Sequence, residues 1–201
     1  AALGIQPQVT DQLYSLFTYE CESLPGWLQL LADGSQPVLL LVPEGRVLTE
    51  VQTWLQSPLA IGTPVQRGNL RLQMLPFISQ DDYDRLLWCC DFNAVRGEDS
   101  FLRALWAGRP LLWHIYQQAD AVHLHKLQAF LDLYKAGLSL PAAAALQGFW
   151  SDWNRGQCPA VGWAALLQHW PELCEHAQQW SIRQAAQQDL AAGLAKFCAN
   201  W

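Results

Sequence analysis

Charged residues and cysteine motifs are both scarce in this sequence. Asp, Glu, Lys and Arg make up 15% of the chain, and 12 Lys and Arg against 18 Asp and Glu leave a net charge of −6. A nucleic-acid surface needs clustered Lys and Arg, so we expect no nucleic-acid partner. The acidic balance is compatible with a basic protein partner.

The cysteines show neither a metal-binding nor a disulfide pattern. None of them forms a CxxC pair, and the spacing predicts free thiols in a reduced, cytoplasmic protein. His169 and His176 share a predicted helix face, but Cys174 is their one further nearby ligand, so we expect no metal site and no other cofactor. The six cysteines are Cys21, Cys89, Cys90, Cys158, Cys174 and Cys198.

Several familiar sequence signals are missing. No apolar run approaches 18 residues and no signal peptide opens the chain, so we expect no membrane association. The motifs GxGxxG, GxxxxGK[ST] and GxSxG do not occur, which weighs against dinucleotide binding, a P-loop and a serine hydrolase. The opening "AALGIQPQ" has no Met, and we expect a domain from a longer chain.

What the sequence does contain is a large apolar fraction. Hydrophobic residues make up 51% of the 201 positions, and 11 of these are tryptophan. This length suits one sizeable domain or two small ones. Because burying an indole ring is strongly favourable, we expect most of the tryptophans in a core or an interface.

The first two-thirds of the chain alternates strand-like and helix-like segments. "PVLLLV" at 37–42 is a continuous apolar run bounded by prolines, typical of a strand buried on both faces of a parallel sheet. Ser79 is expected to cap a helix. The other predicted strands are 14–20, 70–77, 89–95 and 110–116; the predicted helices are 23–34, 46–56, 79–88 and a segment that follows "RGEDS" and ends at Gly108.

After about residue 120 the pattern becomes entirely helical. Pro171 is expected to break or kink the third of the four predicted helices, which are 121–137, 141–154, 162–180 and 181–200. Alternating β/α units with short links imply a parallel sheet with helices on both faces. We therefore predict an α/β, Rossmann-like core over about 12–118 with a helical layer over about 120–201.

The segment "RGEDS" joins a predicted strand to a predicted helix. In open α/β sheets, ligands bind beyond the carboxyl ends of the strands, and the free N–H groups of a helix N-terminus attract phosphate. Gly97 permits close backbone approach, Ser100 adds a hydroxyl, and Arg96 can hold a phosphate through two hydrogen bonds. An alternative interpretation is equally open, in which Glu98 and Asp99 satisfy the helix N-terminus themselves.

Aromatic side chains lie close to the ends of two predicted strands. A nucleobase could stack on Phe77 or Tyr83 while the Gln80 amide hydrogen-bonds to its edge. Both rings could equally belong to the core. The same two interpretations apply to Phe17 and Tyr19, near the end of the first predicted strand.

At this point the sequence resembles a known family, the bacterial EarP protein-arginine rhamnosyltransferases. The segments "YSLFTYE" (14–20), "PVLLLVPEGR" (37–46) and the helical tail resemble that family. The most distinctive match, over 75–118, reads "LPFISQDDYDRLLWCCDFNAVRGEDSFLRALWAGRPLLWHIYQQ".

The resemblance implies a fold and a reaction. Members of this family have the GT-B fold, with two Rossmann-like domains facing a cleft, and transfer L-rhamnose from dTDP-β-L-rhamnose to one arginine of translation elongation factor P, with inversion. The carboxy-terminal domain binds the donor, and the amino-terminal domain binds the acceptor and carries essential aspartates. Residues 1–201 resemble only the carboxy-terminal half, so we expect this chain to bind donor without catalysing transfer alone.

The resemblance also implies a site. It assigns Glu98 and Arg96 to the reaction, with Glu98 needed for activity, and it needs no metal. Asn93 and Tyr116 fall beside the cleft. The thymidine pocket is implied at Phe17, Tyr19, Phe77, Gln80 and Tyr83, and the diphosphate site at Arg96, Asp99 and Ser100, beside Gly97. Two alternatives stay open: a non-catalytic, protein-binding Rossmann-like module, and a GT-B domain that uses another sugar nucleotide.

Overall fold

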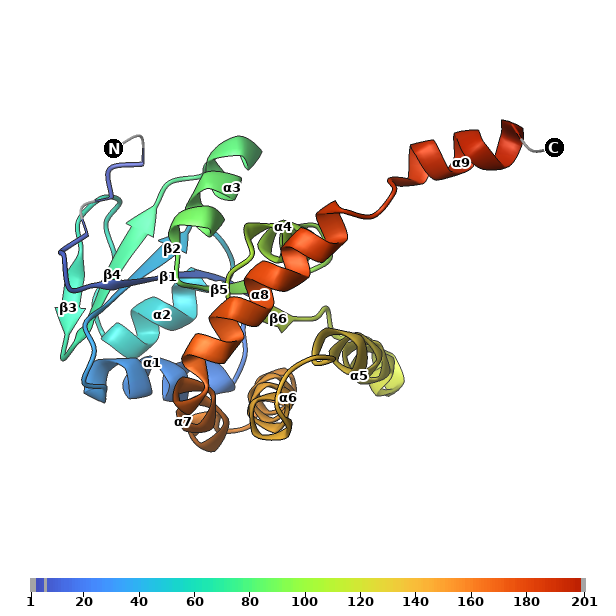
Figure 1. Cartoon of the computed structure of the whole chain (residues 1–201). Coiled ribbons are helices and arrows are strands. Elements are labelled where there is room, and N and C mark those ends of the chain that lie inside the picture. Colours follow the sequence, from blue (N-terminus) through green and yellow to red (C-terminus); the bar gives the residue numbers. More distant parts are fainter. Residues whose placement is uncertain (1–2, 6, 200–201) are drawn as a thin grey trace.

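The chain folds around a six-stranded sheet with helices on both faces (Figure 1); this computed structural model describes residues 3–5 and 7–199. The strands lie in the order β3-β4-β2-β1-β5-β6, and all neighbours are parallel except β3 and β4. The strands are β1 Gln12–Phe17, β2 Val38–Pro43, β3 Val65–Arg67, β4 Leu70–Leu75, β5 Phe92–Arg96 and β6 Leu111–His114.

The strand order creates a topological switch point beside β1. From β1 the chain moves outward through β2 to β4, and then returns to pair β5 with the other side of β1. At such a point the connections leave the sheet in opposite directions, which opens a crevice at the carboxyl ends of the two strands. Here that crevice lies where β1 and β5 end, at Phe17 and Arg96.

The helices form two layers around the sheet. Helices α6 and α7 pack against α1 on one face, whereas α3, α4 and α8 pack together on the other (Figure 1). Helix α9 projects away from the sheet. The bounds are α1 Ser23–Asp33, α2 Leu48–Leu55, α3 Gln80–Cys89, α4 Asp99–Ala107, α5 Val122–Tyr134, α6 Leu140–Asn154, α7 Ala160–Gln168, α8 Trp170–Ala185 and α9 Leu190–Ala199, with a short 3₁₀ helix at Ala119–Ala121.

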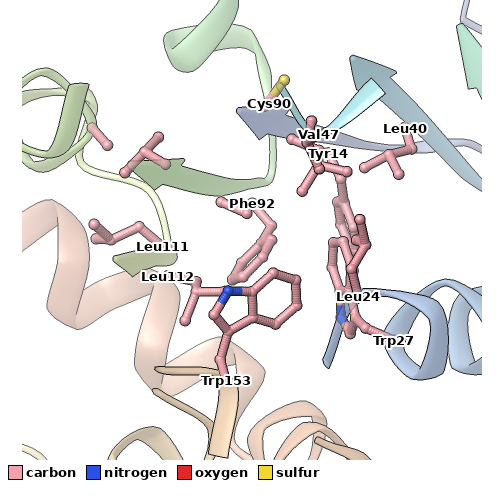
Figure 2. Packing of buried hydrophobic residues seen from close by; sticks show 14 of the residues in the cluster. Tyr14, Leu24, Trp27, Leu40, Val47, Cys90, Phe92, Leu111, Leu112 and Trp153 are labelled. Atoms are coloured by element: carbon pink, nitrogen blue, oxygen red, sulfur yellow. The ribbon is translucent and has the colours of Figure 1, made fainter. Parts of the chain in front are cut away.

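Aromatic side chains pack the layer of α1, α6 and α7 against the sheet (Figure 2). Trp27 of α1 lies 5.6 Å from the ring of Trp153 on α6 and 5.9 Å from Phe92 on β5, centroid to centroid. All three side chains are completely buried. The expectation that tryptophans enter the core is confirmed for these two, and the burial of aromatic surface on this scale stabilises the fold.

Several sequence predictions are confirmed. Every residue of β2 is buried, as its unbroken apolar run indicated. Ser79 caps α3, its hydroxyl accepting a hydrogen bond from the backbone N–H of Asp82 at 3.2 Å. The helix predicted over 162–180 is interrupted just before Pro171, as expected. Pro171 lies in the first turn of α8, where the N–H that proline lacks would have no partner within the helix.

Other predicted boundaries are wrong. The strand predicted at 89–95 begins only at Phe92, because Cys89 completes α3. The strand predicted at 14–20 ends at Phe17, so Tyr19 lies beyond it. The predicted boundary at 180/181 falls inside α8. The predictions also missed β3, which forms a hairpin with β4 through Gly68 at φ +58°.

In the part of the chain that the structure describes, no helix combines the length and the apolar character that crossing a bilayer requires.

Candidate functional site

Arg96 lies at the carboxyl end of β5 and packs against aromatic rings. Its guanidinium carbon is 4.4 Å from the ring centroid of Phe17, the last residue of β1, and 5.1 Å from that of Tyr19. These cation–π distances arise because β1 and β5 are paired in parallel, with Phe17 opposite Val95. The strand pairing therefore brings together three of the predicted site residues.

The positive charge of Arg96 has no carboxylate partner among residues 3–5 and 7–199. Arg103, by contrast, is paired on both sides, with Asp84 and with Asp99, each at 2.9 Å. A guanidinium held by rings alone keeps its N–H donors free for an anion. Arg96 thus has the properties of an anion-binding residue.

Gly97 turns the chain from β5 into α4. Its φ of +62° lies in the left-handed region, which glycine enters readily and which would cost another residue about 1 kcal/mol. A Cβ at this position would also approach the Tyr19 hydroxyl to 3.4 Å. The Gly97 carbonyl accepts a hydrogen bond of 2.7 Å from the indole N–H of Trp113 on β6.

The two carboxylates of "RGEDS" do not cap α4. Glu98 occupies the N-cap position but makes no capping hydrogen bond; its Oε1 instead lies 2.8 Å from Lys126 Nζ on α5. Asp99 pairs with Arg103, one turn further along the helix. The interpretation in which both side chains satisfy the helix N-terminus is therefore wrong, and the first-turn N–H groups have no side-chain acceptor within the described residues. Because α4 directly follows β5, these N–H groups and Arg96 lie at the same end of the sheet.

Tyr83 packs against one of the aromatic residues beside Arg96. It is buried on α3, with its ring 5.6 Å from that of Phe17. Burial raises the pKa of Tyr83, so the phenol stays protonated at physiological pH. Its buried hydroxyl has no hydrogen-bond partner among the described residues.

Phe77 and Gln80 follow the carboxyl end of β4, at the same edge of the sheet as the ends of β1 and β5. Phe77, in the loop from β4 to α3, is 85% exposed, and Gln80 is an exposed first residue of α3. No core packing explains the exposed ring of Phe77, so the core interpretation is wrong for this residue. For Tyr83, burial agrees with the core interpretation.

Tyr116 and Tyr19 form the wall of the site toward β6. Their ring centroids are 5.8 Å apart, and Tyr19 also contacts the ring of His114 edge-on at 5.4 Å. Tyr116 is 57% exposed whereas His114 is completely buried. His114 was not among the predicted site residues. The pairing of β5 with β6 sets it opposite Arg96, a register that sequence spacing does not reveal.

Asn93 lies beneath the site, inside the sheet. It is completely buried, its Oδ1 accepting a hydrogen bond from the Ser15 hydroxyl at 2.6 Å and its Nδ2 donating to the Leu87 carbonyl at 3.0 Å. Because both ends of the amide are engaged within the fold, we leave Asn93 out of the site that touches a ligand.

His114 is expected to lower the stability of the fold in mild acid. Burial lowers the pKa of this imidazole to about 4 from its ordinary value of 6.5. Between these values the unfolded chain binds a proton that the folded chain does not, so stability decreases as the pH falls through 6.5 and toward 4. We expect a loss of about 1 kcal/mol at about pH 5.5.

Urea denaturation at about pH 7 and about pH 5.5 measures this contribution. His114→Phe, which keeps a ring in the core, should show a smaller loss on acidification than the parent chain. His125→Phe, at an exposed position on α5, is the control and should behave like the parent. Equal pH dependence of the parent and His114→Phe would contradict the assignment.

In the described ranges 3–5 and 7–199, no group of three or more His, Cys, Asp or Glu side chains converges on a point where a metal ion could be held. The functional groups of the site are thus a guanidinium, hydroxyls, backbone N–H groups and aromatic rings.

Comparison with known proteins gives one consistent family. A family model described as "Elongation-Factor P (EF-P) rhamnosyltransferase EarP" matches residues 1–199. The protein-arginine rhamnosyltransferase of Pseudomonas aeruginosa is 56% identical over 202 residues, which is 100% of this chain and 54% of that protein. The enzyme of the same name from Shewanella oneidensis is 40% identical, over 98% of this chain and 52% of that protein.

A solved structure gives the same result for the fold. It is described as "Structural basis for EarP-mediated arginine glycosylation of translation elongation factor EF-P", and it matches with a TM-score of 0.90 and 52% sequence identity, over 99% of this chain and 64% of that chain. The predicted fold class, a Rossmann-like α/β half of a GT-B enzyme, is confirmed. The chain spans about half the length of the curated relatives it matches, and by the match over residues 1–199 it belongs to the EarP family of elongation factor P rhamnosyltransferases.

Proposed function

We propose that this chain is the donor-binding, carboxy-terminal domain of a protein-arginine rhamnosyltransferase, and that it binds dTDP-β-L-rhamnose at the carboxyl ends of β1 and β5. One observation carries the proposal. The guanidinium of Arg96 has no carboxylate partner in the described part of the chain and lies beside a helix start whose N–H groups have no side-chain acceptor. Family membership supports the choice of donor.

The diphosphate is assigned to Arg96 and to the first turn of α4, Gly97–Ser100. Arg96 offers two parallel N–H donors to phosphate oxygens. The helix adds backbone N–H groups and the positive end of its dipole. The carboxylates are kept from opposing this charge because Glu98 is paired with Lys126 and Asp99 with Arg103.

The thymine base is assigned to the aromatic edge of the site. The ring of Phe77 is exposed and available for stacking, while the neighbouring Gln80 offers both a donor and an acceptor to the base edge. The rings of Phe17 and Tyr19 already contact the Arg96 guanidinium. These two rings therefore place the arginine in this structure, and Phe77 is the residue with a free face for the base.

The chemistry of transfer follows from this arrangement. Inversion requires one in-line displacement, in which an arginine nitrogen of the acceptor attacks the anomeric carbon and dTDP leaves from the opposite side. Negative charge grows on the departing diphosphate, where Arg96 and the start of α4 stabilise it without a metal. Arginine is a poor nucleophile because its cation is so stable, so a carboxylate must orient it and take a proton. We assign that base to the amino-terminal half, outside this chain.

The acceptor and the location follow from the family. Elongation factor P is proposed as the acceptor, bound mainly by the amino-terminal half, and a cytoplasmic location is proposed because translation takes place there. The relatives are named for arginine rhamnosylation. This chain alone is proposed to bind donor without turning it over.

Thermal denaturation with three nucleotides tests the proposal. At ten times its dissociation constant, dTDP should stabilise the chain by about 1.4 kcal/mol, which corresponds to a rise of roughly 3 to 5 °C in Tm for a domain of this size. UDP and GDP should give smaller shifts at the same concentration. No shift with any nucleotide would favour the protein-binding alternative, and a larger shift with UDP or GDP would favour another sugar nucleotide.

A further inference from the structure

The carbonyl of Gly97 is held by a side chain from the neighbouring strand. Trp113 of β6 is 2% exposed, and its indole Nε1–H donates a hydrogen bond of 2.7 Å to the Gly97 oxygen. We propose that Trp113 is a positioning residue, which orients the Gly97–Glu98 peptide so that the Glu98 N–H is presented to the donor diphosphate. This inference rests on the proposed function.

The geometry of a peptide plane carries the argument. In a trans peptide the C=O and the N–H point in opposite directions. Because the Gly97 oxygen points at the indole, the N–H of Glu98 points away from Trp113. The proposal places the donor diphosphate on that side, beside Arg96. Glycine at φ +62° has few steric constraints on this plane, so a hydrogen bond from outside the loop is needed to fix it.

Trp113 is itself held in one position. Its ring stacks on Phe101 of α4, with centroids 4.0 Å apart and planes 9° from parallel, and meets Phe130 of α5 edge-on at 5.9 Å. Phe101 lies in the first turns of the same helix that follows Gly97. The indole therefore fixes the loop and the helix start relative to each other.

Lys126 extends this arrangement to the next residue. Its ammonium lies 5.5 Å from the Trp113 ring centroid and 2.8 Å from the Glu98 carboxylate. The Trp113 indole thus contacts both the Gly97 carbonyl and the Lys126 ammonium, which pairs with the Glu98 carboxylate. Phenylalanine would fill most of the same space, but it lacks the indole N–H donor of tryptophan.

The chain offers a closely matched control. Trp150 of α6 is also completely buried, and its Nε1–H donates to a backbone carbonyl, that of Leu111, at 2.9 Å. Leu111 begins β6, at the end of the strand opposite to His114. Trp150→Phe therefore removes the same kind of hydrogen bond from the same core without touching Gly97.

Calorimetric titration of the chain with dTDP and with thymidine tests the inference. Trp113→Phe should weaken dTDP binding by about three- to tenfold, the effect of losing one or two well-placed donors, and should leave thymidine binding unchanged because thymidine has no phosphate. Trp150→Phe should bind both like the parent. If Trp113→Phe does not fold, β-(3-benzothienyl)alanine at position 113 keeps the ring shape, lacks the N–H, and should give the same result.

Two results would overturn the inference while the proposed function stands. One is parent-like dTDP affinity in the folded variants at position 113. The other is an equal loss in Trp150→Phe, or an equal loss for thymidine, because either would indicate a general effect on the fold. A parent chain that does not bind dTDP would overturn the proposed function, and this inference with it.

Discussion

Replacing Arg96 with alanine is expected to weaken dTDP binding to this chain by more than tenfold. The variant removes the guanidinium that has no carboxylate partner within the described residues, and with it at least one charge-assisted hydrogen bond to the diphosphate. Such a bond contributes roughly 1.5–3 kcal/mol, which corresponds to about 10- to 100-fold in affinity. Isothermal titration of the parent and the variant with dTDP measures the change.

Arg67 provides the matched control for this prediction. Its guanidinium carbon lies 4.3 Å from the ring centroid of Trp54, so it makes the same type of contact with an aromatic ring, but from β3 at the far edge of the sheet. Arg67→Ala should therefore bind dTDP like the parent. Unchanged dTDP affinity in Arg96→Ala would remove Arg96 from the diphosphate site.

Replacing Glu98 with glutamine in the full-length enzyme is expected to lower turnover by about 10²-fold, the size of effect seen when one electrostatic contribution to a transition state is lost. Glutamine keeps the size of the side chain and can still accept a hydrogen bond from Lys126, so the variant isolates the carboxylate charge. We expect dTDP affinity to change by less than about threefold, because a carboxylate contributes no attraction to a diphosphate.

The control for Glu98 is another exposed carboxylate paired with lysine. Asp132 of α5 lies 2.7 Å from Lys135 Nζ, far along the chain from "RGEDS", and Asp132→Asn should leave both turnover and donor affinity unchanged. The measurement is a comparison of kcat with the dissociation constant for dTDP in each variant. A Glu98→Gln enzyme as active as the parent would exclude Glu98 from the reaction.

Local sequence pattern predicted the parts of this fold that depend on neighbouring residues. The apolar run of β2, the Ser79 cap and the break near Pro171 all have causes within a few positions along the chain. The error at 89–95 has the same origin, because short apolar segments such as "CCDF" do not distinguish the last turn of a helix from the first residues of a strand. The missed strand β3 has only three residues and lies in a segment rich in Pro and Gly. Such a composition predicts a loop, and three residues are too few to show an alternating strand pattern.

The site was predictable in its position but not in its contacts. "RGEDS" follows a strand and precedes a helix, so general rules for α/β sheets indicated a ligand there. Sequence alone could not decide between capping and pairing for Glu98, since its partner Lys126 is 28 positions away on α5. The contacts of Arg96 with Phe17, and of Trp113 with Gly97, likewise depend on strand register.

A crystal structure of this chain with dTDP tests the central claim most directly. The account predicts that the diphosphate oxygens lie within hydrogen-bond distance of the Arg96 guanidinium and of the backbone N–H groups of Gly97–Ser100, with the thymine against Phe77. A nucleotide bound elsewhere, for example in the polar cavity of about 590 Å³ lined by Glu20, Glu50 and His123, would contradict it.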